Sequence, residues 1–103
     1  MKNNSVKYEF SAKVYHHSTS ADMSGWVMVS LPKEISSEIR DHFKWLEQGW
    51  GRMKIVAKIG NSNWDTAIWF DTKQDTYLLP LKAVIRKKEN IVIGENVDII
   101  IWV

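Results

Sequence analysis

The chain has 103 residues, of which 45% are hydrophobic and 25% are charged, and it contains no cysteine. This composition is ordinary for a soluble globular protein and excludes intrinsic disorder, and the length supports one domain with one hydrophobic core. Disulfide bonds, thiolate metal sites and cysteine nucleophiles are excluded as well. The net charge of +2 is too small to direct the whole molecule toward nucleic acid.

The ends of the chain carry an expectation about location. The N-terminal segment lacks the apolar stretch of a signal peptide, and the longest apolar run, Ile99–Val103, is far shorter than the roughly 20 residues that cross a bilayer. We therefore expect a single cytoplasmic domain over residues 1–103, with residues 1–6 frayed and no membrane contact.

In the first half of the chain, alternating apolar and polar residues predict a strand at Tyr8–Val14. The segment His16–Gly25 is rich in Ser, Thr, Asp and Gly without periodicity, which predicts a loop of about ten residues. Alternation resumes at Trp26–Leu31, which predicts a second strand. After Pro32 the apolar residues recur at helical spacing, and we expect Gly49 to cap this helix at its C-terminal end.

The second half begins with an alternating strand at Gly51–Gly60, followed by an Asn-Ser-Asn turn and a strand at Trp64–Asp71 that pairs back. A short strand at Thr76–Leu79 leads into a short helix at Leu81–Glu89. The last strand, Val97–Val103, is apolar on both faces near its end. Such a strand is either central in the sheet or covered by a partner chain.

Two similar segments, Val29–Arg40 and Tyr77–Lys88, carry the clearest statement about architecture. Each runs from an apolar strand through Leu-Pro into a basic, helix-forming stretch. Proline lacks a backbone donor for strand pairing and is accepted in the first turn of a helix, so Leu-Pro predicts a strand-to-helix corner. A corner used twice indicates two halves of one mainly β barrel.

From Trp26 to Val103 the chain resembles the small prokaryotic domains of unknown function 1905. The resemblance rests on Gly25-Trp26, Leu31-Pro32, Arg52 with the strand after it, Tyr77–Lys87 and Ile93–Val97. Glu95 departs from the expected pattern, in which Asp follows the Gly. The resemblance implies a double-split β-barrel of about six strands with two short capping helices, similar to the barrels of AbrB- and MazE-type DNA-binding dimers. It implies no established reaction.

Catalytic and metal-binding patterns are weak in this sequence. His16 and His17 are adjacent, so on a strand they face opposite ways, and no third ligand follows at a recognisable spacing. No nucleophile-elbow or phosphate-loop motif is present. We therefore expect no metal and no cofactor.

Basic residues near the C-terminal helix are candidates for ligand contact. Lys82 and Arg86 are spaced to share one helix face, and Lys87 follows. Such a face can hold phosphate or a carboxylate. The favoured alternative is a solvated basic face in which Arg86 ties the helix to a backbone carbonyl or carboxylate.

The middle hairpin interleaves aromatic and basic residues, since Trp50, Trp64 and Trp69 lie near Lys54 and Lys58. This pattern can stack bases or an aromatic ligand. Core filling is the favoured alternative, because Trp64 and Trp69 differ in parity and face opposite sides of one strand.

We expect a non-catalytic module, monomeric or homodimeric, that binds an unknown small molecule or protein; six tryptophans and no catalytic constellation motivate this expectation. The candidate binding residues are Arg52, Lys54, Trp64, Lys82, Arg86 and Lys87. The alternative is an AbrB-like nucleic-acid-binding regulator with Lys82, Arg86 and Lys87 on phosphates. A third hypothesis is an enzyme that uses Arg52 or Arg86 beside Asp65 or Asp98, which a cavity lined by two of these groups would support.

Overall fold

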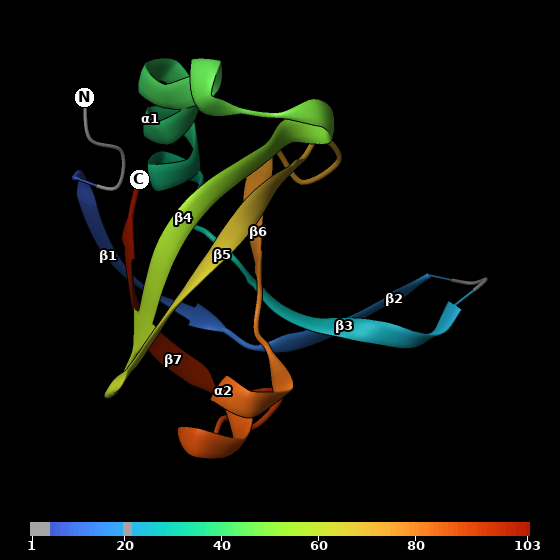
Figure 1. Cartoon of the computed structure of the whole chain (residues 1–103). Coiled ribbons are helices and arrows are strands. Elements are labelled where there is room, and N and C mark those ends of the chain that lie inside the picture. The colour runs from blue at the N-terminus through green and yellow to red at the C-terminus, as the bar shows by residue number, and fades with distance from the viewer. Residues whose placement is uncertain (1–4, 20–21) are drawn as a thin grey trace.

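A computed structural model of the chain describes the backbone of residues 5–19 and 22–103, and within these ranges the side chains of all but residues 17–19, 22–25 and 50. In this part of the chain one antiparallel sheet of seven strands curls around a core and carries two helices (Figure 1). The strands are β1 (Lys7–Lys13), β2 (Tyr15–Thr19), β3 (Asp22–Ser30), β4 (Arg52–Ile59), β5 (Ser62–Asp71), β6 (Thr76–Pro80) and β7 (Asn96–Trp102). The helices are α1 (Lys33–Phe43) and α2 (Ala83–Lys88), and 3-10 turns lie at Lys44–Leu46 and Gly49–Gly51. The expectation of a mainly β fold with two short helices is confirmed.

The strand order is β1-β7-β4-β5-β6-β3-β2, so the two edge strands are consecutive in the sequence. Only Val14 separates them. Its side chain is fully buried, its N–H donates to the carbonyl of Glu95, and its own carbonyl accepts from Gly94. One segment therefore joins both ends of the curled sheet. The sheet has seven strands where about six were expected, because β2 lies in the segment predicted as a loop.

The strands that lead into the two Leu-Pro corners lie side by side. β3 and β6 pair antiparallel, with Val29 opposite Leu79, so the two corners point in opposite directions. Pro32 is the N-cap of α1, whereas Lys82, two residues beyond the second proline, is the N-cap of α2. The helices consequently leave the sheet at opposite ends (Figure 1). The repeated strand-to-helix corner is confirmed, although Pro80 stays within β6, opposite Met28.

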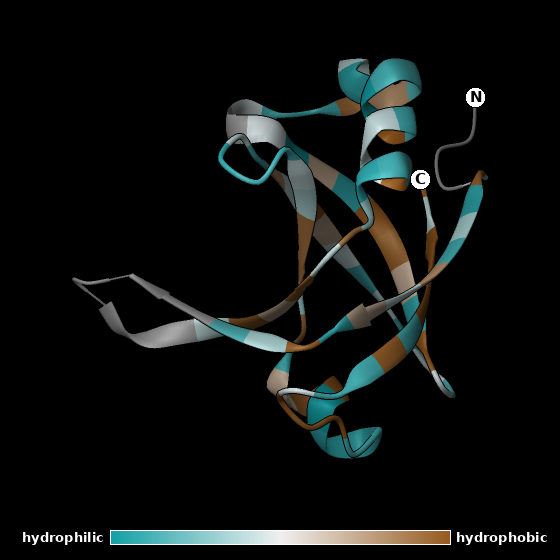
Figure 2. Cartoon of the chain, turned by 180° about the vertical axis from the view of Figure 1, so that it is seen from behind, coloured by the Kyte–Doolittle hydropathy of each residue, from teal (hydrophilic) through white to brown (hydrophobic). Residues whose placement is uncertain are grey.

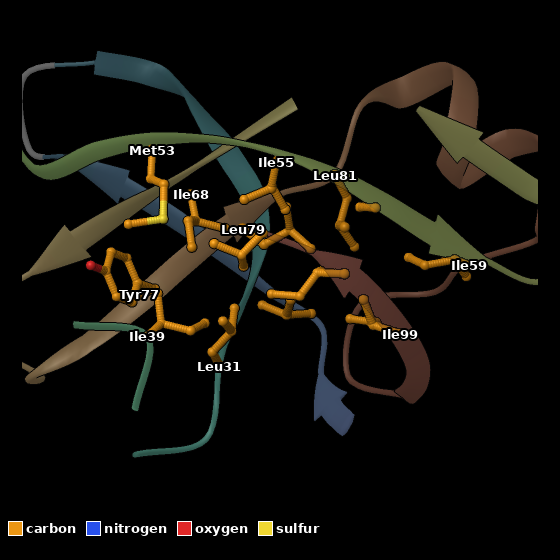
Figure 3. Close-up of a cluster of buried hydrophobic side chains, with 14 of the residues drawn as sticks. Leu31, Ile39, Met53, Ile55, Ile59, Ile68, Tyr77, Leu79, Leu81 and Ile99 are labelled. Carbon is orange, nitrogen blue, oxygen red and sulfur yellow. The ribbon is translucent and has the colours of Figure 1, made fainter. Parts of the chain in front are cut away.

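The inward faces of the strands meet in one hydrophobic core. Hydrophobic and hydrophilic residues alternate along the strands (Figure 2), and the hydrophobic ones converge on β6 (Figure 3). Tyr77 and Leu79 of β6 are fully buried, and Ile39 of α1 closes one end of the core. The Ser36 hydroxyl accepts a hydrogen bond of 3.0 Å from the Tyr77 backbone N–H, which fixes α1 to the sheet.

The closing strand is central. β7 pairs with β1 on one side and with β4 on the other, and Ile99, Ile101 and Val103 are buried in the core. Of the two alternatives for this strand, the structure therefore supports a position inside the sheet. At the other end of the chain, Val6 exchanges backbone hydrogen bonds with Val103, so it is paired rather than frayed; residues 1–4 lie outside the described residues.

Two expected boundaries are wrong. The predicted loop His16–Gly25 belongs largely to a β2–β3 ribbon, with residues 20 and 21 outside the described residues. This ribbon projects beyond the rest of the sheet (Figure 1), where no core imposes an apolar alternation that a sequence pattern can report. The first helix ends at Phe43, so Gly49 does not cap it and instead begins a separate 3-10 turn.

The turn between β4 and β5 depends on Gly60, which has a φ of 58°. A Cβ atom there would clash with the carboxylate of Glu89, which accepts a 2.6 Å hydrogen bond from the Ser62 hydroxyl. We expect Gly60→Ala to lower the free energy of unfolding by about 1–2 kcal/mol, the usual cost of a left-handed non-glycine residue. Chemical denaturation measures this difference.

Gly49→Ala is the matched control. A Cβ at Gly49 meets no atom within 4 Å, and the residue does not have a positive φ. We expect this variant to lie within about 0.5 kcal/mol of the parent. If Gly60→Ala lowered the free energy of unfolding no more than Gly49→Ala does, the turn would tolerate a side chain at position 60.

Candidate binding groove

The outer face of the sheet, opposite the core, is unusually apolar where β5, β6 and β3 run side by side. Met28, Ala67 and Leu78 alternate with core residues along their strands and belong to the outer face, yet they are only 7%, 2% and 9% exposed. Solvent-facing positions of an antiparallel sheet are ordinarily polar. Residues buried on this face mark a groove that neighbouring side chains wall off.

The cross-strand register shows how the groove forms. Outward residues fall in rows across β4, β5, β6 and β3: Arg52, Trp69, Leu78 and Ser30 in one row, then Lys54, Ala67, Pro80 and Met28 in the next. Two residues beyond this row lie Val56, Asp65 and Trp26 on their strands, and Lys82 just past the end of β6. The centre of this grid holds Ala67 and Pro80, a small and a flat side chain, with larger side chains around them. We call the resulting hollow the outer groove.

The outer groove has a volume of about 550 Å³ and continues into an apolar cleft of about 210 Å³. The larger part is lined by Trp26, Arg52, Lys54, Ile55, Asp65, Thr66, Ala67, Trp69, Pro80, Leu81 and Lys82. The cleft adds Met28 and Leu78. Trp26 and Trp69 line both parts from opposite sides, Trp69 on β5 and Trp26 on β3, and Trp26 is 57% exposed. Two indoles therefore flank an apolar floor.

Cations dominate the polar rim. The Arg52 guanidinium lies 5.7 Å from the centroid of the Trp69 ring, within cation–π range, and its Nη1 donates a 3.1 Å hydrogen bond to the Gln48 side chain. Lys54 and Lys82 also line the groove, and Asp65 supplies the carboxylate among the described lining residues. Within the described residues the ion pairs are Lys7–Glu9 and Arg40–Glu47, so these rim lysines are not neutralised by a bonded carboxylate.

The structure divides the six expected site residues. Arg52, Lys54 and Lys82 line the outer groove together. Trp64 does not, because it pairs with Ala57 on the inner face and packs against the core, with a buried Nε1 that lacks a hydrogen-bond partner.

The other two expected residues belong to α2. Arg86 donates from Nε to the Leu81 carbonyl at 3.1 Å, which is the structural tie expected of its guanidinium. Lys87 is exposed on the helix and does not line the outer groove.

Sequence reasoning gave less weight to the aromatic walls. Trp26 and Trp69 sit at the outward parity of β3 and β5, and the same parity carries Met28 and Leu78. Large apolar residues at the outward positions of a strand indicate that its outer face is covered, so they were a usable signal for the groove. What was missing was the knowledge that β3, β6 and β5 are neighbours.

A second polar cluster lies inside the fold, under α1. The Tyr77 hydroxyl donates to Glu47 Oε2, and Arg40 Nε lies 3.4 Å from the same oxygen. The Arg40 guanidinium also stands 3.7 Å above the centroid of the Phe70 ring. Burial raises the pKa of Tyr77 well above its ordinary value, and the hydrogen bond to Glu47 raises it further. The hydroxyl stays protonated at neutral pH, so the cluster ties the segment after α1 to β5 and β6 rather than supplying a base.

The enzyme hypothesis names four residues, and the groove brings two of them together. Arg52 and Asp65 both line it, which meets the condition set for the enzyme hypothesis, whereas Arg86 and Asp98 lie elsewhere. Among the described residues that line the groove, Thr66 supplies a hydroxyl group and Asp65 a carboxylate, but no histidine accompanies them. No group of three histidine, aspartate or glutamate residues that could hold a metal ion occurs in the described ranges.

A curled antiparallel sheet with two corner helices and an amphipathic outer groove defines a small, mainly β domain. The chain belongs to the family described as Domain of unknown function (DUF1905), whose model matches residues 10–101. The resemblance noted from the sequence is thereby confirmed. No curated protein is significantly similar to the chain. In the part of the chain that the structure describes, every helix is too short or too polar to cross a membrane.

Proposed function

We propose that the chain is a single domain of the double-split β-barrel type that acts as a non-catalytic binding module, with the outer groove as its site. The barrel type is supported by the paired Leu-Pro corners of β3 and β6 and by Val14, which links the two edge strands. The site is supported by one observation above all: the sheet buries apolar side chains on its outer face, between two indoles and a cationic rim.

The groove fits a ligand that combines a planar apolar body with an anionic group. Its volume of about 550 Å³ lies within the range of roughly 300–1,000 Å³ that small-molecule sites occupy. The indoles of Trp26 and Trp69 offer flat apolar faces, and Arg52, Lys54 and Lys82 offer positive charge. A neutral aliphatic ligand would leave the rim lysines unused, and a small inorganic anion would leave the apolar floor exposed.

Binding through α2 is the weaker alternative. A nucleic-acid regulator that relies on Lys82, Arg86 and Lys87 needs the three side chains free to reach phosphates, but the Arg86 Nε is engaged by the Leu81 carbonyl. Lys82 faces the groove, whereas Lys87 does not line it. Catalysis is also less favoured, because the described lining residues place no histidine beside Arg52 and Asp65 to activate the Thr66 hydroxyl.

We expect planar aromatic anions to bind the parent protein and to lose about 5- to 150-fold in affinity with Trp69→Ala, because stacking on an aromatic side chain contributes about 1–3 kcal/mol. The probes are naphthalene sulfonate, indole acetate and adenosine monophosphate, screened by thermal shift and titrated by isothermal calorimetry. Uncharged naphthol tests the need for the anionic group.

Trp45→Ala is the matched control for the loss of an indole. Trp45 is 68% exposed on the 3-10 turn after α1, outside the groove, and its Nε1 bonds only the His42 carbonyl. We expect this variant to bind like the parent. The proposal is wrong if none of the probes binds, or if Trp45→Ala and Trp69→Ala weaken binding equally.

A further inference from the structure

We infer that the ligand of the outer groove is a short stretch of single-stranded nucleic acid, held with its phosphates along β4 and its bases on the flanking tryptophans. This inference rests on the proposed function, since it names the ligand class of the same site. It depends on how the outward residues of β4 and its neighbours are ordered.

The outward side chains of β4 form a basic track. Arg52, Lys54 and Lys58 alternate with core residues along this strand, with Val56 between the two lysines. Alternate residues of a strand are about 6.8 Å apart, so Lys54 lies one such interval from Arg52 and two from Lys58 along one line. Lys58 continues this line beyond the outer groove, into a hollow that Glu9 and Asp98 also line. A groove of this kind follows an extended sugar-phosphate backbone, whereas a single anionic group needs only one such cation.

Tryptophans stand on both sides of this track. On β5, Trp69 lies directly opposite Arg52. On β7, Trp102 lies opposite Val56 and therefore shares its outward face. Both indoles are partly exposed. Binding of single strands without sequence preference needs two components, aromatic side chains and a line of cations. The bases stack on the aromatic rings, and the phosphates contact the cations.

The remaining groove residues suit a nucleotide. The hollow over Ala67 and Pro80 lies beside Lys54, so a base that stacks on Trp69 extends over an apolar floor. The Asp65 carboxylate on the rim can accept hydrogen bonds from the sugar hydroxyls or exocyclic amines of a nucleotide. A ligand that carries only anionic groups has no donor for it. Duplex nucleic acid fits less well, because its bases are stacked on one another and unavailable to the indoles.

The direct test is fluorescence anisotropy with a labelled ten-nucleotide oligothymidylate at low ionic strength, repeated over a series of salt concentrations. We expect the logarithm of the binding constant to fall with the logarithm of salt concentration with a slope of about −2, which corresponds to roughly three phosphates on a single strand. Lys54→Ala is expected to reduce the slope by about 0.7, since one phosphate contact is lost. Lys87→Ala, on the exposed face of α2, is its matched control and is expected to leave the slope unchanged.

Stacking is tested separately at one salt concentration. Trp69→Ala is expected to weaken oligothymidylate binding about 5- to 150-fold, Trp69→Phe to keep most of the affinity, and Trp45→Ala to bind like the parent. The phenylalanine variant retains a ring, so its recovery separates stacking from any local loss of folding. A ten-base-pair duplex is expected to bind more weakly than the single strand.

The outcomes separate the inference from the proposed function. If oligothymidylate does not bind while small aromatic anions bind and depend on Trp69, the inference is overturned and the groove remains a small-molecule site. If duplex binds more tightly than single strand, or if Lys87→Ala lowers the salt slope as much as Lys54→Ala, the inference is overturned in favour of α2. If neither oligonucleotide nor aromatic anion binds, both are overturned.

Discussion

Leu79→Ala is expected to lower the free energy of unfolding by about 2–5 kcal/mol, the usual cost of truncating a large aliphatic side chain in a closed core. Leu79 is fully buried on β6, where the inward faces of the sheet converge (Figure 3). Its backbone pairs with Val29 across the two corners, so little room exists for neighbouring side chains to move into the cavity. For a chain of about 100 residues each kcal/mol lowers Tm by about 4–8 °C, which calorimetry resolves easily.

Leu78→Ala is the matched control, because it removes the same atoms one residue away. Leu78 is 9% exposed but points to the outer face and lines the apolar cleft with Trp26 and Trp69. Solvent and the neighbouring indoles can fill the space, so we expect a loss smaller than that of Leu79→Ala. Equal losses would mean that the outer apolar cluster is as closed as the core and would argue against a site open to ligands.

Local patterns were sufficient for the elements that border the core. Period-two alternation identified the inward residues of β4 and β7, and the change to helical spacing after Pro32 located α1. These predictions succeeded because burial on one face imposes a period that the sequence must carry. The β2–β3 ribbon escaped the same reasoning, since most of it projects away from the core and no such period is imposed.

The site was only partly predictable, because it depends on which strands are neighbours. The parity of Trp69 could be read from the sequence, but its position across β6 from the outward residues of β3 could not. Lys54 was identified by its proximity to the tryptophans in sequence and Arg52 through the family resemblance, and both line the groove. Trp64 was selected on the same ground and faces the core instead. The hollow itself arises from register, which places Ala67 and Pro80 side by side at its centre.

The second large effect concerns alkaline pH. Burial, followed by the hydrogen bond to Glu47, raises the pKa of Tyr77 in the folded state well above the ordinary value of about 10. Burial and a hydrogen bond with Glu38 likewise raise the pKa of Tyr8, to about 12. Between the unfolded and the folded pKa the folded state holds more protons than the unfolded state, so stability is complete below about pH 10 and falls as pH rises further. The slope contributed by the fully buried Tyr77 approaches about 1.4 kcal/mol per pH unit.

Tyr77→Phe tests this origin of the alkaline transition. At pH 8 the variant is expected to be less stable by about 1–3 kcal/mol, because Glu47 loses a donor in a partly buried site. Between about pH 10 and 11.5 its free energy of unfolding is expected to fall less steeply than that of the parent, since the proton that linked folding to pH is gone. Tyr15→Phe is the control: Tyr15 hydrogen-bonds Ser30 at 3.0 Å, away from Glu47, and its removal should leave the parent's slope. If urea titrations gave parallel pH dependences for the parent and both variants, the Arg40–Glu47–Tyr77 cluster would not be the origin of the alkaline transition, and the raised pKa of Tyr8 would remain as its cause.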